Sequence, residues 1–314
     1  MDMLQTETGS RPDIAGFWRR LVALAIDLFL LGIAGMILGG LLFDQLARMG
    51  VAARLVGFAI ALAYFGIGNS RLLGGQTVGK MLLGLRVVGL QGQQLSLPRA
   101  MLRYAVLGVP FFANGLPIDP RLAMSPVLGP ALALLVFSGM AAVVYLYVFN
   151  RHTRQSLHDL AAGSLVVRAE SPGHAQPLAP VWRGHFVVLA LLGALALSAP
   201  VVAKRFAGSE AFAGLLPLQA ELARQPHVIA AQVARGWSKA GGQETHYLQS
   251  NLRLDAPLTE DGDLARRMAR QMAQADPRRA SEDAIVVDLV YGYDIGIATG
   301  WKSHRYTFGP DPSR

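Results

Sequence analysis

The sequence predicts an α-helical membrane protein with a small α+β domain at its C-terminal end. Hydrophobic residues make up 52% of the 314 residues, and charged residues make up only 16%. The apolar residues lie in long runs, which are typical of membrane spans rather than of one large soluble core. Residues 204–314 differ, because shorter helix-like and strand-like patterns replace the long runs there.

Five apolar segments are long enough to span a bilayer, which requires about 20 residues. We expect a polar tail at 1–16, a four-span domain at 17–170, a linker at 171–183, and then the fifth span. The third segment is the weakest, since it carries Arg99 and Arg103, and a re-entrant or interfacial helix is the alternative there. The expected spans are 20–43, 51–68, 98–117, 126–149 and 184–203.

The distribution of positive charge predicts the orientation of these spans. The chain has a formal net charge of +8. With the N-terminus inside and five spans, twelve arginines and lysines of the membrane part fall on the inner side and three on the outer side. Cytoplasmic loops have this positive bias. We therefore expect a cytoplasmic N-terminus, an extracytoplasmic domain at 204–314, and no nucleic-acid partner.

Two inner segments resemble each other and predict a parallel repeat. Residues 76–88 and 155–167 align without a gap, and each begins with Gln and a hydroxyl residue and ends in Val-Val. Each repeat then consists of two spans, a short helix ended by glycine, and a strand. Since Lys80 aligns with Asp159, we expect the two repeats to meet across a pseudo-two-fold axis where these charges pair. A small hairpin is expected around residues 91–92.

The domain at 204–314 is expected to place one helix on a four-stranded antiparallel sheet in the order ββαββ. A further helix is expected at 208–224. Aromatic residues near the last two strands, together with Asp294, could form a recognition edge, although packing within the sheet is the plainer interpretation. These aromatic residues are Tyr291, Tyr293 and Trp301. The expected strands and helix are 228–237, 245–254, 263–275 (the helix), 285–293 and 303–308.

A single ionisable residue, Asp27, lies in the apolar run from Leu21 to Phe43. A carboxylate in hydrocarbon costs roughly 2.5–3.5 kcal/mol, so it is a functional-site hypothesis by default. Arg20 lies on the same helix face and is the first partner to consider. If Asp159 packs on this span, Arg20 would lie between two carboxylates, leaving one net negative charge for a proton or small cation. A polar staple that only holds helices together is the alternative.

Four motifs stand out between residues 14 and 168: Gly16-Phe17-Trp18-Arg19-Arg20, Ile26-Asp27, Gly75-Gln76-Thr77-x-Gly79-Lys80 and Leu157-His158-Asp159-Leu160-x-x-Gly163. In combination, these motifs resemble the RDD family of bacterial membrane proteins. The family is named for one arginine and two aspartates, which the resemblance assigns to Arg20, with Arg19 as the alternative, and to Asp27 and Asp159. Thr77, Lys80 and His158 lie in the supporting motifs. Ser164 stands where threonine is commoner.

The resemblance implies a multi-pass protein of the bacterial inner (plasma) membrane. Transport of an unidentified ligand has been suggested for the family, and cation–proton exchange has been reported for some members. We therefore expect a transporter in which Asp27 holds a proton or monovalent cation and Lys80 with Asp159 forms an inner gate. The alternative is a non-transporting scaffold or sensor whose outer domain binds a partner in the cell envelope.

Other features predict little chemistry beyond this. The lipid bilayer is the expected partner of the spans, and Gly35-x-x-x-Gly39 allows close approach of a second helix. We expect that helix to come from the same chain, with a homodimer as the alternative. The chain has no cysteine, and no nucleophile–base pair or metal-ligand spacing indicates a catalytic residue, a cofactor or a metal.

Overall fold

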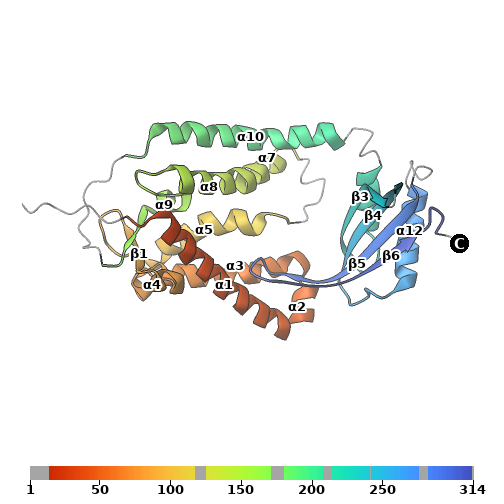
Figure 1. Ribbon diagram of the computed structural model, residues 1–314, viewed down its shortest axis with the longest axis horizontal. Helices are drawn as coiled ribbons and strands as arrows, with labels where there is room; N and C mark the ends of the chain where they lie inside the picture. The colour runs from red at the N-terminus through yellow and green to blue at the C-terminus, as the bar shows by residue number, and fades with distance from the viewer. Residues whose placement is uncertain are drawn as a thin grey trace, which may run out of the picture. The chain divides into compact units, whose positions relative to one another are not determined.

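The computed structural model describes residues 14–116, 125–170, 180–207, 214–240, 242–275 and 282–312. Most of the predicted linker at 171–183 and of the tail at 1–16 lies outside these ranges. The chain divides into two compact units, and most of their helices and strands are labelled in Figure 1. Unit 1 holds the described residues up to Ala34, then Leu55–Leu116 and Ser125–Ala199, while unit 2 holds Gly35–Arg54 and the described residues from Pro200 onward.

Helices dominate unit 1, with two short strands. Its elements are α1 (Phe17–Leu41), α3 (Ala53–Gly68), η2 (Arg71–Leu73), α4 (Val78–Leu82), β1 (Leu85–Gly89), α5 (Leu97–Ala113), α7 (Leu128–Ala133), the π-helical turn η3 (Leu134–Ser138), α8 (Gly139–Phe149), α9 (Leu157–Ala162), β2 (Ser164–Arg168) and α10 (Arg183–Ala207). Helices α1, α3 and α10 each continue past the limit of the unit.

Four helical stretches in the described part of the chain are long and apolar enough to cross a bilayer. They are Phe17–Leu41, Gly50–Gly68, Leu128–Phe149 and Arg183–Val202. The chain is therefore a helical membrane protein with a C-terminal sheet domain. The expected span at 98–117 falls on α5, which has 17 residues and is not among the four. That α5 crosses the bilayer stays a prediction.

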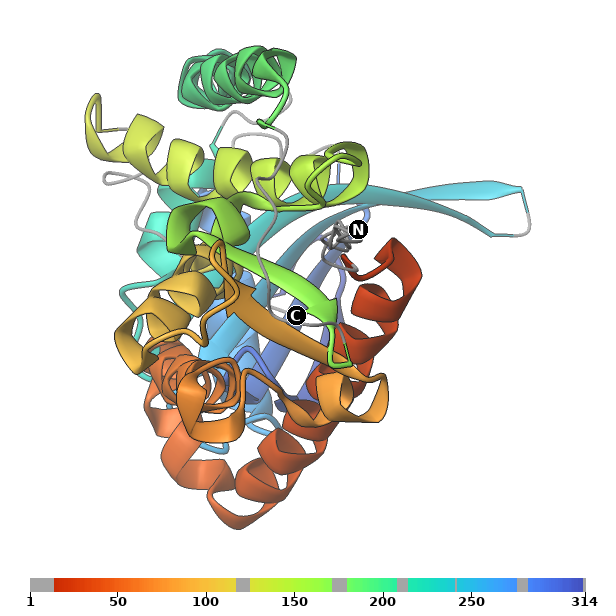
Figure 2. The same cartoon turned by 90° about the vertical axis from the view of Figure 1, so that its left-hand side faces the viewer.

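The two inner segments meet in a small antiparallel sheet. Strand β1 pairs with β2, and Val87 lies opposite Val166 at the centre of the pair (Figure 2). The two valines are also equivalent in the alignment of the two segments. The hairpin expected around 91–92 is wrong, because the chain only turns there, with the Gly89 N–H donating to the Gln93 carbonyl. Strand β1 is instead paired by its counterpart from the second segment.

Equivalent glutamines brace the two halves of this sheet. The Gln76 side-chain amide donates to the Leu85 carbonyl at 2.7 Å, and the Gln155 amide donates to the Ser164 carbonyl at 3.0 Å. Small and aliphatic side chains fill the space beside the strands. This buried cluster comprises Ala15, Ala23, Leu85, Val87, Leu95, Ala100, Ala162 and Val166. The small side chains of Ala23 and Ala100 allow helices α1 and α5 to approach the sheet closely.

Unit 2 contains a four-stranded sheet with helices packed on it. Its elements are α2 (Phe43–Arg48), η1 (Gly50–Ala52), α11 (Leu215–Leu222), β3 (Val228–Ala240), β4 (Gln243–Leu254), α12 (Gly262–Ala275), β5 (Ala284–Asp294) and β6 (Thr299–Phe308). The order ββαββ is as predicted from sequence. The helix expected at 208–224 is described from Leu215, since 208–213 lie outside the described residues.

The sheet has the strand order β3-β4-β5-β6, and its central pair corrects the sequence prediction. Pairs β3–β4 and β5–β6 are antiparallel, but β4 and β5 run parallel. The prediction of a fully antiparallel sheet was therefore wrong. Helix α12 explains the difference, because a helical crossover carries the chain back along the sheet before the next strand begins.

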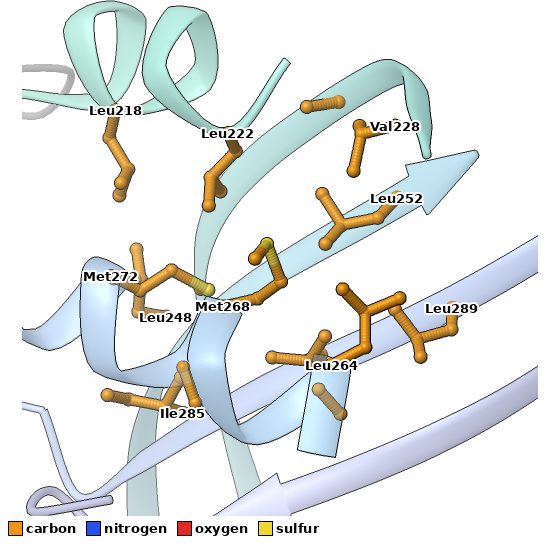
Figure 3. Close-up of a cluster of buried hydrophobic side chains, with 14 of the residues drawn as sticks. Leu218, Leu222, Val228, Leu248, Leu252, Leu264, Met268, Met272, Ile285 and Leu289 are labelled. Carbon is orange, nitrogen blue, oxygen red and sulfur yellow. The ribbon is translucent and has the colours of Figure 1, made fainter. Parts of the chain in front are cut away.

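The core of this domain lies between the sheet and helices α11 and α12 (Figure 3). Leu264, Met268 and Met272 recur every four residues on α12 and are all buried. This spacing places them on one face of the helix. They join the same buried cluster as Leu248 and Leu252 of β4. Burial of this apolar face, rather than any disulfide, holds the helix on the sheet.

Segment Gly35–Arg54 belongs to unit 2 and packs on the same sheet. The Phe43 ring lies edge-on to Tyr291 and Tyr293, at centroid distances of 5.8 and 5.5 Å. The Tyr291 hydroxyl donates to Asp44 at 2.8 Å. Both tyrosines are buried, so the plainer interpretation of packing, rather than an open recognition edge, applies to them.

The glycines of Gly35-x-x-x-Gly39 also face this domain rather than a second helix. A Cβ at Gly39 would collide with the Tyr293 ring, and one at Gly35 would lie 2.8 Å from the Ala298 side chain. The expectation of a helix neighbour is therefore wrong for these two positions. The turn between β5 and β6 approaches closely here, because glycine leaves room for it.

Candidate functional site

Asp27 is completely buried and accepts three hydrogen bonds in unit 1. The Thr77 hydroxyl donates to it at 2.5 Å, the Tyr64 hydroxyl at 2.6 Å, and the Gly79 backbone N–H at 2.7 Å. These donors come from α3 and from the start of α4. The carboxylate in α1 is thus satisfied by neutral donors, which reduces the cost of burying it.

The sequence Thr77-x-Gly79 builds this contact through local geometry. Thr77 is extended and precedes the first turn of α4, where backbone N–H groups have no partner within the helix. Gly79 contributes one of these groups to Asp27. A Cβ at Gly79 would strike the Ala23 carbonyl and lie 3.0 Å from the Asp27 carboxyl carbon. Glycine is therefore the residue that lets α4 reach α1.

Lys80 is the cation nearest to Asp27, with 3.9 Å between its Nζ and the carboxylate. The ammonium also donates to the Thr77 hydroxyl at 3.1 Å. Burial lowers the pKa of Lys80 to about 7, and the charge of Arg103 adds to this effect, while Asp27 opposes it. An amine with this pKa exchanges its proton near neutral pH.

Asp159 of α9 lies between two arginines. Arg20 donates to Oδ2 at 2.7 Å, and Arg103 donates to Oδ1 at 2.7 Å. The Ser164 hydroxyl and the Ser156 backbone N–H add bonds of 3.2 Å each. Burial alone would raise the pKa of Asp159, but Arg103 and Arg20 hold this pKa well below its usual range. This carboxylate is therefore a fixed negative charge.

Arg20 contacts Asp159 rather than Asp27, which were the two partners that the sequence left open for it. Its guanidinium binds Asp159 and the Arg154 carbonyl and lies 5.0 Å from the centre of the Tyr147 ring. The cation that lies within ion-pair distance of Asp27 in the described part of the chain is Lys80. The expected pairing of Lys80 with Asp159 was wrong, because Arg20 and Arg103 occupy the oxygens of Asp159.

Arg103 is the residue that sequence reasoning missed. In the sequence it stands out only as a charge that weakens the third apolar segment, yet its side chain is buried beside Asp159. An arginine inside an apolar helix, one turn after Arg99, was the available signal. With Lys80 protonated, the cluster holds three cations and two carboxylates. The expected net negative charge was therefore wrong.

The remaining predicted residues differ in their surroundings. His158 is buried, and its Nε2 lies 3.6 Å from Asp159, which is beyond hydrogen-bond distance. Burial lowers the pKa of His158 to about 3, and Arg103 and Arg20 act in the same direction against Asp159. The imidazole is therefore neutral near pH 7. Arg19 is exposed, so Arg20 is the arginine that joins the cluster.

The donor set around Asp27 suits a small hard cation rather than a transition metal. Carboxylate and hydroxyl oxygens from Asp27, Tyr64 and Thr77 converge there, and such oxygens are the usual ligands of hard cations. Among the described residues, no group of three or more His, Cys, Asp or Glu side chains could hold a metal ion.

Comparison with known proteins adds one finding. Residues 14–163 match the model of the RDD family, a stretch that includes Arg20, Asp27, Lys80, Arg103 and Asp159. No curated protein and no solved structure has a significant match to the chain.

Proposed function

Because residues 14–163 form an RDD-family domain, we propose that this chain exchanges a small monovalent cation for protons across a bacterial inner membrane. The proposal depends on one observation: the buried carboxylate of Asp27 lies 3.9 Å from the ammonium of Lys80. When Lys80 carries a proton, its charge balances Asp27. When Lys80 loses that proton, Asp27 is left for a cation, so the two positive charges compete for one carboxylate.

In this mechanism the two parts of the cluster have different roles. Asp27 with the hydroxyls of Tyr64 and Thr77 is the exchanging part, because its only charged neighbour within ion-pair distance among the described residues is Lys80. Asp159, held by Arg20 and Arg103, forms a fixed frame beside it. The balance is one proton lost from Lys80 for each monovalent cation bound.

The proposal also includes two features of the membrane domain. Helix α5 is a span, and the two similar halves of the domain, which contain residues 76–88 and 155–167, form a parallel repeat. Arg99 at the start of α5 donates to the Ala162 carbonyl at the end of α9 at 2.8 Å. At the other end of α5, Pro110 lies within 3.0 Å of where a Cβ on Gly139 would be, at the start of α8. Helix α5 therefore runs alongside α8 in the opposite direction, as an antiparallel neighbour would.

Charge and strand pairing support the proposed direction of crossing. Strands β1 and β2 are side by side, so the chain that leaves through α5 returns through α7 and α8. Together with the positive-inside bias, this arrangement supports a cytoplasmic N-terminus and an extracytoplasmic domain after the last span.

The test is cation-driven proton movement in inverted membrane vesicles at matched protein abundance. We expect exchange in the wild type and none in Asp27→Asn. We expect Lys80→Met to keep cation uptake while losing its coupling to protons, and Asp44→Asn to behave as the wild type, because Asp44 lies in unit 2. Unchanged exchange in Asp27→Asn would remove the basis of the proposal.

A second candidate is a non-transporting scaffold or sensor. The observation that favours it is that every hydrogen bond to Asp27 ties α1 to α3 or to the segment that begins α4. As a staple, Asp27 would set stability alone. Asp27→Asn would then lower thermal stability without changing any flux, and crosslinking of the outer domain in cells would capture an envelope partner. Neither candidate assigns the chain an enzymatic activity.

A further inference from the structure

A pocket of about 360 Å³ opens in unit 1 beside the charge cluster. It lies where α1 begins and α8 ends. The residues that line it are Phe17, Arg20, Tyr147, Val148, Asn150, Arg151 and Arg154. Three of these seven are arginines and none is acidic, so the pocket is strongly positive.

Within the described residues, two of the three arginines lack an acidic partner. Arg20 binds Asp159, but neither Arg151 nor Arg154 has a carboxylate within ion-pair distance in the part of the chain that the structure describes. Unbalanced guanidinium groups that converge on one pocket favour an anion, and phosphate oxygens match the planar fork of arginine well.

The backbone at Arg154, one of the residues that line this pocket, has an unusual conformation. Arg154 adopts a φ of 52°, which is uncommon for a residue other than glycine. In this conformation its carbonyl accepts a hydrogen bond from Arg20. Arg20 and Arg154, which this bond joins, both line the cavity. Such backbone strain persists only where surrounding contacts hold it in place.

The pocket lining also contains apolar side chains, here called the apolar wall, and their place in the chain indicates the bilayer surface. Phe17 and Val148 line it, and both belong to helical stretches long enough to span a membrane. Trp18, next to Phe17, is 73% exposed. Tryptophan at the end of a span is typical of the interface between hydrocarbon and headgroups.

From this geometry we propose that the pocket binds the phosphate group of an anionic phospholipid, with the arginines on the phosphate and the apolar wall beside the glycerol and upper acyl chain. A free phosphate shares the anionic chemistry but cannot use the apolar wall. The site is distinct from Asp27, and the proposal does not depend on cation exchange.

The test measures lipid binding by the purified full-length protein in neutral detergent, using native mass spectrometry and thermal unfolding. The probes are dioleoylphosphatidylglycerol, dioleoylphosphatidylcholine and inorganic phosphate at equal ionic strength. The test variant is Arg151→Gln with Arg154→Asn, since asparagine tolerates a positive φ. The charge-matched control is Arg19→Gln with Arg183→Gln, two exposed arginines outside the pocket.

We expect phosphatidylglycerol to bind the wild type and the control and to raise their unfolding temperatures, while phosphatidylcholine does not. The double pocket variant should bind phosphatidylglycerol roughly 25-fold more weakly, at about fivefold per arginine. The single variant Arg151→Gln, which changes an exposed side chain, should show about a fivefold loss even if the double variant folds poorly.

Equal binding of phosphatidylglycerol by wild type and pocket variants would overturn the proposal. Equal loss in the pocket variant and the control would also overturn it, because it would indicate general surface charge. Saturable binding of inorganic phosphate that displaces the lipid, with no gain from the acyl chains, would reassign the pocket to a free anion.

Discussion

Arg20 donates to Asp159 across 2.7 Å, although the two residues are 139 positions apart in the sequence. Arg103, from a third segment, completes the same contact from the other side of the carboxylate. One aspartate therefore holds the beginning of α1, the middle of α5 and the start of α9 together. Its removal would leave two buried arginines without the carboxylate that now pairs with them.

Asp159→Asn is expected to destabilise the protein by about 3–5 kcal/mol, because breaking a buried ion pair leaves uncompensated charge. Thermal or denaturant unfolding of the purified protein measures this loss. Asp255→Asn is the control, since the Asp255 side chain is 45% exposed and its ion-pair partner among the described residues is an exposed histidine. Its effect should stay below about 1 kcal/mol. Equal effects of the two substitutions would contradict the role of Asp159.

Gly79→Ala is expected to disrupt the Asp27 site, because the added methyl group would meet the Ala23 carbonyl and the Asp27 carboxyl group. We expect a lower unfolding temperature and loss of any cation-dependent stabilisation. Gly40→Ala is the matched control, since a Cβ there would meet no atom within 4 Å. Alanine favours a helix over glycine by about 1 kcal/mol, so the control should be neutral or more stable.

Lys80 should make stability depend on pH. Its folded pKa of about 7 lies below the ordinary value of 10.5, so between these values the unfolded chain holds a proton that the folded chain has lost. Unfolding free energy therefore rises with pH across this window. In Lys80→Met this rise should be smaller, whereas Lys239→Met, at an exposed position, should keep the wild-type slope. Parallel curves for wild type and Lys80→Met would rule out the lowered pKa.

Met268→Ala tests the core of the outer domain. Met268 is 2% exposed in the cluster between α12 and the sheet, and truncating a buried methionine costs about 2–5 kcal/mol. Hydrogen exchange in the full-length protein should become faster at the amides of β4 and β5. Arg267→Ala, on the exposed side of α12, should change stability by less than about 0.5 kcal/mol. Unchanged exchange in Met268→Ala would mean that this core does not limit local opening.

Periodicity and hydropathy predicted most of the secondary structure. The helix expected at 263–275 is α12, and the strands expected at 228–237 and 245–254 pair antiparallel as β3 and β4. The parallel pairing of β4 with β5 could not be read in this way. The direction of β5 depends on the end of the sheet at which the chain leaves α12. The spacing of residues within a strand carries no information about this.

The sequence predicted which residues form the site, but it did not predict which of them contact one another. Motifs singled out Arg20, Asp27, Thr77, Lys80 and Asp159, and all five are buried in unit 1. Which cation meets which carboxylate depends on tertiary packing. Helix spacing placed Arg20 on the face of Asp27, yet the long guanidinium reaches α9 instead.

The hydrogen bond from Tyr291 to Asp44 has a consequence for how the chain is made. Its partners are separated by 247 residues, so a ribosome that has completed α2 must add most of the protein before Tyr291 exists. Until then Phe43, which follows the first membrane helix, lacks its contacts with the rings of Tyr291 and Tyr293. Chains cut short before β5 would keep that apolar surface open, which gives cellular quality control a feature by which to tell unfinished copies from complete ones.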